Sequence, residues 1–271
     1  MFNILKVKRP AILALSIILL AGTLAMCLLI FNLDIRDAVR TKVLSTTKEV
    51  KAVFLGIKKT TPILAYHGVG TDYSWGGKRY FVSPAEFENQ VKYLSDNGYT
   101  AITINQLDSI KSVDKPVILT FDDGYEDVYT YAYPILKKYG MHASIFIISD
   151  FIGKGHYLTT NQILSMMDVF DIESHTKTHP SLAKIDKDTV NYELSQSKAD
   201  IKKLIGKPVC AIAYPNSSFD IYVTKTASKY YKYGLMNWGG KYYGFENPLR
   251  IPRIPIYWDD DINEFKQKIK N

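Results

Sequence analysis

Short runs rich in β-branched and aromatic residues alternate with helix-forming stretches along most of this 271-residue chain. Such alternation is typical of a parallel sheet, in which each helix returns the chain to the start of the next strand. The number of repeats predicts an α/β protein with a closed or nearly closed (β/α) barrel. The expected strands are 100–104, 117–121, 143–148, 169–173, 209–214 and 234–237, and the expected helices are 128–139, 160–167, 189–204 and one that is capped by Ser83 and ends at Gly98.

Acidic and imidazole side chains follow two of these strands at the points where the strands end. Asp122 and Asp123 come directly after one strand, and His175 follows another, with His179 four residues later. One carboxylate and two histidines are the usual protein ligands of a catalytic zinc site, which keeps a fourth position open for water. The second carboxylate is then available as a general base. This combination predicts metal-assisted hydrolysis.

Each of these two motifs has a simpler interpretation when it is taken alone. An Asp-Asp-Gly sequence is usually a turn, because Asp and Gly favour turn conformations for local reasons. Two histidines four residues apart are often surface residues on a helix. The order of the motifs and their positions after strands favour the metal site.

The net charge of +7 is unevenly distributed along the chain. Lys6, Lys8 and Arg9 contribute three of these charges, and no acidic residue precedes Asp34. The remainder shows no clustered basic stripe, so nucleic-acid binding is not expected.

The N-terminal segment predicts where the protein works. Residues 11–33 carry no charge, are rich in Leu, Ile and Ala, and are long enough to span a membrane as a helix. Basic residues before such a helix stay in the cytoplasm, which sends the rest of the chain outward. We therefore predict a cytoplasmic basic segment (1–10), a transmembrane signal anchor (11–33), a stalk (34–59) and a catalytic domain (60–271) outside the cytoplasm at the cell membrane.

Cleavage is the main alternative to this anchor. Thr23-Leu24-Ala25 resembles a small-residue cleavage site, and cutting there would release a secreted domain. The apolar run continues past this point, which favours an uncleaved anchor. A lipid-modified Cys27 is a further alternative, although Met26 is bulky for the position before such a cysteine.

The chain has two cysteines, Cys27 in the predicted anchor and Cys210 in an apolar run. These positions do not favour pairing, so the exported domain has no disulfide framework and depends on a sizeable core.

Three motifs together resemble those of the polysaccharide deacetylase family, carbohydrate esterase family 4. They are Thr120-Phe121-Asp122-Asp123-Gly124, His175-Thr176-Lys177-Thr178-His179 and Ala213-Tyr214-Pro215-Asn216. The resemblance covers roughly residues 60–258. Segments 63–69, 81–99 and 249–253 resemble the branch of the family that deacetylates biofilm poly-β-1,6-N-acetylglucosamine.

The resemblance implies a distorted (β/α) barrel and a bound divalent metal. Asp123, His175 and His179 would hold this metal, with zinc as the first candidate and Co²⁺ or Ni²⁺ as alternatives. Asp122 would accept the proton of the attacking water. That division is chemically sensible, because a metal polarises the acetamide oxygen and lowers the pKa of water.

Two further roles follow from the resemblance. The backbone N–H of Tyr214 would stabilise the tetrahedral oxyanion. In most family members a histidine near the C-terminus protonates the leaving amine, but no histidine follows His179 here. An early histidine does so in the poly-N-acetylglucosamine branch, and His67 matches it; a core histidine bonded to backbone is the alternative for His67.

The third motif departs from the family pattern. Many members carry an arginine at the position of Ala213, where it orients the catalytic aspartate. Arg250 and Arg253 are the candidates to replace it.

The chain also contains 20 tyrosines and three tryptophans, most of which are expected in the core. Trp238 is the first candidate to line a sugar groove. Glu173 alternates with His175 along one strand, so both a supporting role behind the metal and a purely structural role are open for it.

The sequence as a whole predicts a membrane-anchored, metal-dependent hydrolase that removes acetyl groups from N-acetylglucosamine units of a surface polysaccharide. Poly-β-1,6-N-acetylglucosamine is the expected substrate, and a polysaccharide synthase or export machinery is a candidate partner. A peptidoglycan deacetylase using the same chemistry is the enzymatic alternative. A catalytically silent polysaccharide-binding protein is the alternative from another class, although such a protein has no need of Asp122.

Overall fold

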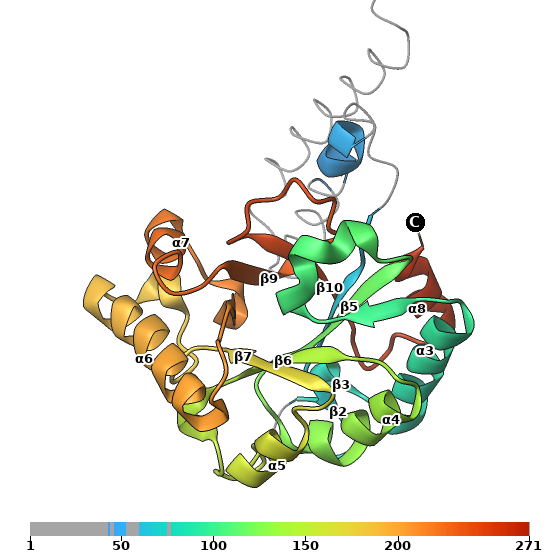
Figure 1. Ribbon diagram of the computed structural model, residues 1–271, viewed down its shortest axis with the longest axis horizontal. Helices are drawn as coiled ribbons and strands as arrows, with labels where there is room; N and C mark the ends of the chain where they lie inside the picture. The colour runs from blue at the N-terminus through green and yellow to red at the C-terminus, as the bar shows by residue number, and fades with distance from the viewer. Residues whose placement is uncertain (1–42, 44–45, 53–59, 75–76, 271) are drawn as a thin grey trace, which may run out of the picture.

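Parallel strands form a closed ring in the computed structural model, which describes residues 43, 46–52, 60–74 and 77–270 (Figure 1). Within these residues the main sheet has eight strands in the order β1-β10-β9-β8-β7-β6-β5-β4, and β1 also pairs with β5. This extra pairing closes seven strands into a barrel, with β4 attached outside the ring. The strands are β1 (Ile63–Tyr66), β4 (Thr100–Ile102), β5 (Pro116–Phe121), β6 (Ala143–Ile147), β7 (Phe170–Ser174), β8 (Ala211–Ala213), β9 (Tyr233–Gly239) and β10 (Ile251–Pro255).

Strand β5 makes the closure because two strands share one of its edges. Its first residues, from Pro116 to Ile118, pair with β4, and its residues from Ile118 to Phe121 pair with β1. The other edge of β5 pairs with β6. The first strand, β1, therefore lies between the last strand, β10, and β5, after which Asp122 follows.

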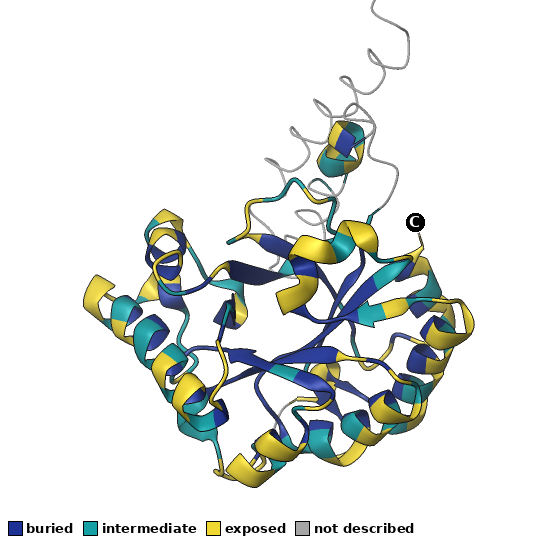
Figure 2. Ribbon diagram, viewed as in Figure 1, coloured by how far each residue is buried: buried dark blue, intermediate teal, exposed yellow. Residues whose placement is uncertain are grey.

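Helices surround the ring of strands (Figure 1). Their inward faces are buried and their outward faces are exposed, whereas the strands are buried along most of their length (Figure 2). The helices are α3 (Pro84–Asp96), α4 (Tyr133–Lys138), α5 (Thr160–Ser165), α6 (Lys187–Ile205), α7 (Ile221–Ala227) and α8 (Ile262–Ile269). A small separate sheet pairs β2 (Gly68–Val69) with β3 (Phe81–Val82).

Two apolar clusters occupy the two faces of the barrel wall. The larger cluster packs strand residues such as Leu119 and Ile145 against the helices. The smaller cluster combines residues of several strands, such as Ile118 and Phe146, with Ile104 and Leu107 of the 3-10 helix η3 (Ile104–Ser112), and fills the barrel interior. Side chains alternate along a strand, so every second residue faces the barrel interior. These inward-facing residues are polar near the strand ends.

Most predicted elements are confirmed, with identifiable differences. The expected helix 128–139 is split into a π-helical turn, η4 (Val128–Ala132), and α4, with Pro134 in the first turn of α4. The expected strand 100–104 ends at Ile102, because η3 begins at Ile104 with a capping box between Thr103 and Gln106. Strands β1 and β10 were not predicted as strands.

Glu173 lies inside the barrel next to η3, where it closes that end of the barrel. One carboxylate oxygen accepts from the N–H groups of Cys210 and Ala211 (2.8 and 2.7 Å), and the other accepts from Asn105 Nδ2 (2.8 Å). Its side chain is fully buried, and burial raises the pKa of Glu173 to about 7. These contacts favour the structural role over the supporting role at the metal.

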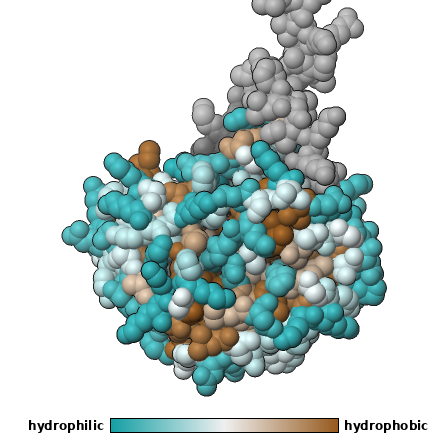
Figure 3. All heavy atoms as spheres, in the orientation of Figure 1, coloured by the Kyte–Doolittle hydropathy of each residue, from teal (hydrophilic) through white to brown (hydrophobic). Residues whose placement is uncertain are grey.

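The predicted segments 1–10, 11–33 and most of 34–59 lie outside the described residues, so the anchor, the stalk and the location of the domain stay predictions. Within the described residues, no helix combines the length and the apolar composition that crossing a membrane requires. On the face shown in Figure 3, hydrophilic residues surround separate apolar patches.

Replacing Glu173 with Gln tests its buried carboxyl group. A folded-state pKa above the unfolded value means that the folded state binds the proton more tightly, so this contribution is complete below about pH 4.5 and is lost as pH rises through 7. The free energy of unfolding should therefore fall less steeply between pH 5 and 8 in the variant, by an amount on the order of 3 kcal/mol at most. Denaturant titrations at several pH values measure this slope, with exposed Glu264→Gln as the control. Equal slopes in wild type and Glu173→Gln would contradict the prediction.

Candidate metal centre

The turns after β5 and β7 bring Asp123, His175 and His179 together at the carboxyl end of the barrel. Asp123 Oδ1 lies 3.3 Å from His175 Nε2 and 3.4 Å from His179 Nε2. One ligand atom from each of the three residues lies within 4.8 Å of the others. Two imidazole nitrogens and one carboxylate oxygen form a donor set that suits zinc and similar divalent metals.

Left-handed backbone conformations place these side chains. Asp123 has φ 72°, Thr176 has φ 66° and His179 has φ 65°. Residues other than glycine adopt this region at a cost of about 1–2 kcal/mol each. Gly124 follows with φ 81°, and a Cβ there would come within 2.9 Å of Ile147 Cγ2. Asn216 of the third motif is also left-handed, with φ 55°, so each of the three sequence motifs contains such a residue.

A backbone carbonyl fixes the orientation of His175. Its Nδ1 lies 2.8 Å from the carbonyl oxygen of Ala213, so Nδ1–H donates and Nε2 is left facing Asp123 and His179. The N–H of His175 also donates to the carbonyl of Ile147 (2.9 Å). A carbonyl partner of this kind selects the tautomer that a metal needs.

Glu193 of α6 holds the loop between the two histidines, a role that the sequence reasoning missed. Glu193 Oε2 accepts from the N–H groups of Lys177 and Thr178 (both 2.9 Å), and Oε1 accepts from Thr178 Oγ1 (2.6 Å). Its carboxylate is buried. An acid on the apolar face of a predicted helix, next to Leu194, was the signal available in the sequence.

Arg253 of β10 holds Asp122 in a buried two-point contact. Arg253 Nη1 donates to Asp122 Oδ1 (2.8 Å), and Nη2 donates to Oδ2 (2.6 Å). The guanidinium also donates to Thr120 Oγ1 (3.0 Å) and to the carbonyl of Met236 (3.1 Å), and it is fully buried. Of the two arginines proposed to replace an arginine at Ala213, Arg253 therefore contacts the aspartate. Arg250 is exposed and lies over Phe219 instead.

Both aspartates are held ionised. Burial opposes ionisation of Asp122, but the charges of Arg253 and His175 and the hydrogen bonds from Arg253 outweigh it and lower the pKa of Asp122. Burial also opposes ionisation of Asp123, but the hydrogen bond from His175 and the charges of the neighbouring imidazoles lower the pKa of Asp123 further. The centre therefore offers two carboxylates at neutral pH.

His67 follows β1 and lies within electrostatic reach of both aspartates. Burial lowers its pKa, while the charges of Asp123 and Asp122 act in the opposite direction. Its Nδ1 is buried without a hydrogen-bond partner, and its ring packs on Tyr80 with centroids 4.8 Å apart. Nδ1 therefore has no backbone partner, and the general-acid role of His67 stays a prediction beside the alternative of a core histidine.

The N–H of Tyr214 is already used in the sheet, where it donates to the carbonyl of Leu235 (3.1 Å). The predicted oxyanion role would require that this hydrogen bond be given up. Its side chain is buried and donates to the carbonyl of Leu249 (3.1 Å). Pro215 has no N–H, so Asn216, at φ 55°, carries the next amide hydrogen after that of Tyr214.

Trp238 lies near the end of β9 and is half-buried. Its ring stacks on Phe219 with centroids 6.4 Å apart, and Phe219 packs on Tyr214 at 5.0 Å. These contacts place Trp238 beside the segment that follows β8, and its role in sugar binding stays a prediction.

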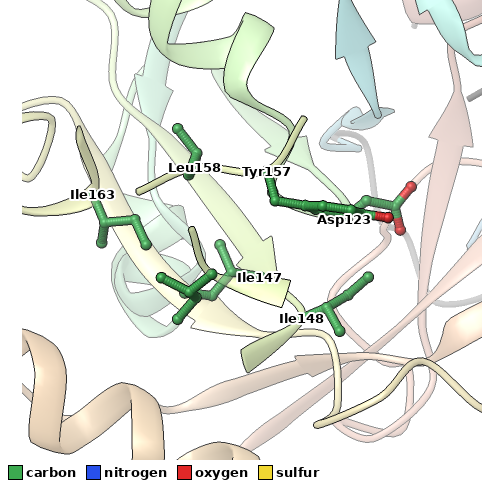
Figure 4. A pocket seen from close by; sticks show the side chains of 8 residues that line it. Asp123, Ile147, Ile148, Tyr157, Leu158 and Ile163 are labelled. Atoms are coloured by element: carbon green, nitrogen blue, oxygen red, sulfur yellow. The ribbon is translucent and has the colours of Figure 1, made fainter. Parts of the chain in front are cut away.

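A small apolar pocket backs the Asp123 carboxylate (Figure 4). Side chains of β6, the turn after it, the segment before α5 and α5 itself line this pocket: Ile147, Ile148, Ile152, Tyr157, Leu158 and Ile163. These side chains shield one side of Asp123 from water. This burial is the effect that opposes ionisation of Asp123.

A (β/α) barrel with a His-His-Asp centre and a second, ionised carboxylate at its carboxyl end defines a metal-hydrolase class of site. The polysaccharide deacetylase family model matches residues 109–234. The poly-beta-1,6-N-acetyl-D-glucosamine N-deacetylase of Staphylococcus aureus (strain MRSA252) is 30% identical over 216 residues, which cover 66% of this chain and 69% of that protein. The chain belongs to the polysaccharide deacetylase family, and this confirms the enzyme class expected from the motifs.

Two further similarities agree with this family. YxkH of Bacillus subtilis (strain 168), which carries a provisional polysaccharide deacetylase name, is 37% identical over 174 residues, or 62% of this chain. The matched part spans 61% of that relative's length. A Streptococcus pyogenes deacetylase solved in complex with acetate has 28% identity and a TM-score of 0.73, covering 79% of this chain and 99% of its own.

Replacing Glu193 with Gln tests the support of the histidine loop. An amide nitrogen in place of one carboxylate oxygen faces N–H donors instead of accepting from them, so the loop should lose its anchor. We expect the affinity for Zn²⁺ to fall about 10- to 100-fold. Competition with a metal chelator measures this affinity, and Asp188→Asn on the same helix is the control. Unchanged zinc affinity in Glu193→Gln would show that the loop holds its shape without this carboxylate.

Replacing Arg253 with Lys tests whether the arginine lowers the pKa of Asp122. A single ammonium cannot reproduce the two-point contact, so the pKa of Asp122 should rise. The acid limb of the pH dependence of kcat/KM should therefore move to higher pH, and disruption of a buried pair should destabilise the fold by about 3–5 kcal/mol. Arg250→Lys is the matched control. A pH profile that stays in place in Arg253→Lys would rule out this role.

Proposed function

We propose that the protein is a metal-dependent N-deacetylase that releases acetate from N-acetylglucosamine units of poly-β-1,6-N-acetylglucosamine. The proposal rests on the presence of a metal-ligand set and a general base side by side. Three ligand atoms converge at Asp123, His175 and His179, and an ionised base, Asp122, is held beside them by Arg253.

The donor set fits a divalent metal, with zinc as the first candidate. The tautomer of His175 is set for coordination through Nε2, and burial is the main cause that lowers the pKa of His179 to about 4, so that its ring is neutral at physiological pH. When bound, the metal would supply Lewis-acid polarisation of the acetamide and a lowered pKa for the attacking water.

The chain's own residues would then carry the proton transfers. Asp122 accepts the proton of the attacking water, and Arg253 keeps this carboxylate ionised and fixed before the reaction. His67 gives a proton to the departing amine; because burial lowers its pKa, the ring must first take up a proton, and its imidazolium is then a stronger acid. The N–H of Asn216, beyond the sheet, is the better candidate than that of Tyr214 to stabilise the oxyanion, because the sheet already uses the N–H of Tyr214.

The relatives support the substrate class. The Staphylococcus aureus relative is named for poly-beta-1,6-N-acetyl-D-glucosamine, and the Streptococcus pyogenes structure contains acetate, the product expected here. Peptidoglycan is the alternative substrate for the same chemistry. A silent polysaccharide-binding protein is disfavoured because Asp122 and Arg253 form a complete base that binding alone does not need.

The cellular setting is part of the proposal. The uncharged segment 11–33 would anchor the enzyme with its catalytic domain outside the cytoplasm, with release after cleavage as the alternative. There it would act on polymer delivered by a synthase or export machinery.

Acetate release from two substrates tests this proposal. The full chain, loaded with zinc, is incubated with β-1,6-linked N-acetylglucosamine oligomers and with peptidoglycan in parallel. We expect release from the oligomers that stops on chelation, and a loss of at least about 100-fold in Asp122→Asn, because a positioned base contributes on the order of 10²–10⁴ in rate. Release from peptidoglycan alone would overturn the substrate, and release that survives Asp122→Asn would overturn the mechanism.

A further inference from the structure

A row of aromatic residues, formed by Tyr80, Tyr257 and Trp258, lies beside His67. Tyr80 of the short 3-10 helix η2 (Lys78–Tyr80) packs on His67, with ring centroids 4.8 Å apart. Tyr257, which follows β10, lies next in the row, with its ring centroid 6.3 Å from that of Tyr80. Trp258 follows Tyr257 in the chain.

Backbone and cation contacts join the two segments that form this row. The N–H of Trp258 donates to the carbonyl of Arg79 (3.1 Å), and the guanidinium of Arg79 lies over the Tyr257 ring (4.6 Å). Lys78 Nζ lies 3.8 Å from the centroid of the Trp258 ring. The segment after β10 is also tied to β1, because the N–H of Ile256 donates to the carbonyl of Ala65 (3.0 Å). The row therefore joins η2 to the segment after β10, and a backbone hydrogen bond to β1 holds that segment on the barrel.

The row is accessible even though its members are large and apolar. Tyr80 is 40% exposed and Trp258 is 46% exposed. The other large exposed side chains of the described residues, such as Tyr131 and Tyr192, lie on helices. Exposed aromatic residues that border a catalytic centre are typical of a binding surface rather than of a core.

The chemistry of the row suits a neutral sugar. Aromatic rings offer flat apolar faces together with polar edges, which suits a pyranose ring with its C–H faces and hydroxyl rim. Lys78 and Arg79 are cationic, so the row does not suit a polycation. A sugar that still carries its N-acetyl group has no charge to be repelled, whereas a deacetylated unit is an ammonium at neutral pH.

We propose that Tyr80, Tyr257 and Trp258 form a glycan-binding platform that seats N-acetylated sugar units adjacent to the unit under attack. This proposal rests on the proposed function, because it names where the rest of that polymer binds. The platform makes the enzyme favour longer, acetylated chains over short ones. The basic residues beside it favour departure of the chain once its units have become cationic.

Chain-length dependence of turnover tests the platform. The kcat/KM for acetate release is measured for a β-1,6-linked N-acetylglucosamine pentamer and for the disaccharide, in the full zinc-loaded protein. Loss of stacking in Trp258→Ala should lower the ratio of the two values about tenfold, equivalent to about 1.4 kcal/mol. Trp258→Phe should restore most of this ratio because it keeps an aromatic face. Tyr131→Ala, at a similarly exposed tyrosine of η4, is the control and should keep the wild-type ratio.

The outcomes separate the platform from the proposed function. Acetate release by wild type with an unchanged ratio in Trp258→Ala would overturn the platform and leave the function standing. Absence of release from both oligomers by wild type would reject the function. In that case calorimetric titration with the pentamer decides the platform: weaker binding by Trp258→Ala supports it, and equal affinity for wild type and variant overturns it.

Discussion

The buried contact between Arg253 and Asp122 is the interaction on which the rest of the site depends. Two charges removed from water are unfavourable unless their hydrogen bonds are nearly all satisfied. Arg253 meets this condition by donating to Asp122, Thr120 and the carbonyl of Met236, all from inside the barrel. The pair thus connects β10 with β5 and β9 while it keeps the base ionised. The same contact therefore positions the catalytic base and holds together the strands that close the barrel.

The irregular pairing of β9 with β10 shows how this contact is accommodated. Between the paired positions Ile251–Leu235 and Arg253–Gly239 the register shifts, so that β9 contains extra residues there. Met236 lies in this irregular part, and its carbonyl accepts from Arg253 Nε instead of completing a regular ladder. Bulges of this kind redirect backbone groups next to active sites. An arginine from the last strand can therefore replace one that would otherwise come from the position of Ala213.

The sequence predicted the local motifs and the alternation of strands and helices, but it did not predict the long-range contacts. Asp122, Asp123, His175 and His179 lie in short motifs whose spacing itself indicates their chemistry, and the alternation of elements predicted the barrel. Strand β1 is four residues long and β10 contains two prolines, so neither has the pattern of a regular strand. The sequence supplied Arg250 and Arg253 as equal candidates, because only the closed barrel determines which side chain points inward. Glu193 was missed because two of its three donors are backbone amides, so its position on the apolar face of a helix was the only signal of its role.

The strain at the metal centre explains why so many supporting contacts surround it. Asp123, Thr176 and His179 all adopt left-handed conformations that an unsupported chain would leave. The second motif is held from two sides: Glu193 accepts from the N–H groups of Lys177 and Thr178, and the carbonyl of Lys177 accepts from the N–H of Asp150 (3.0 Å). These contacts keep the loop in shape through the protein itself rather than through its ligand. Because hydrogen bonds within the protein hold the ligand-bearing loop in shape, binding a metal should need little reorganisation, and more of the free energy of coordination should remain available for affinity.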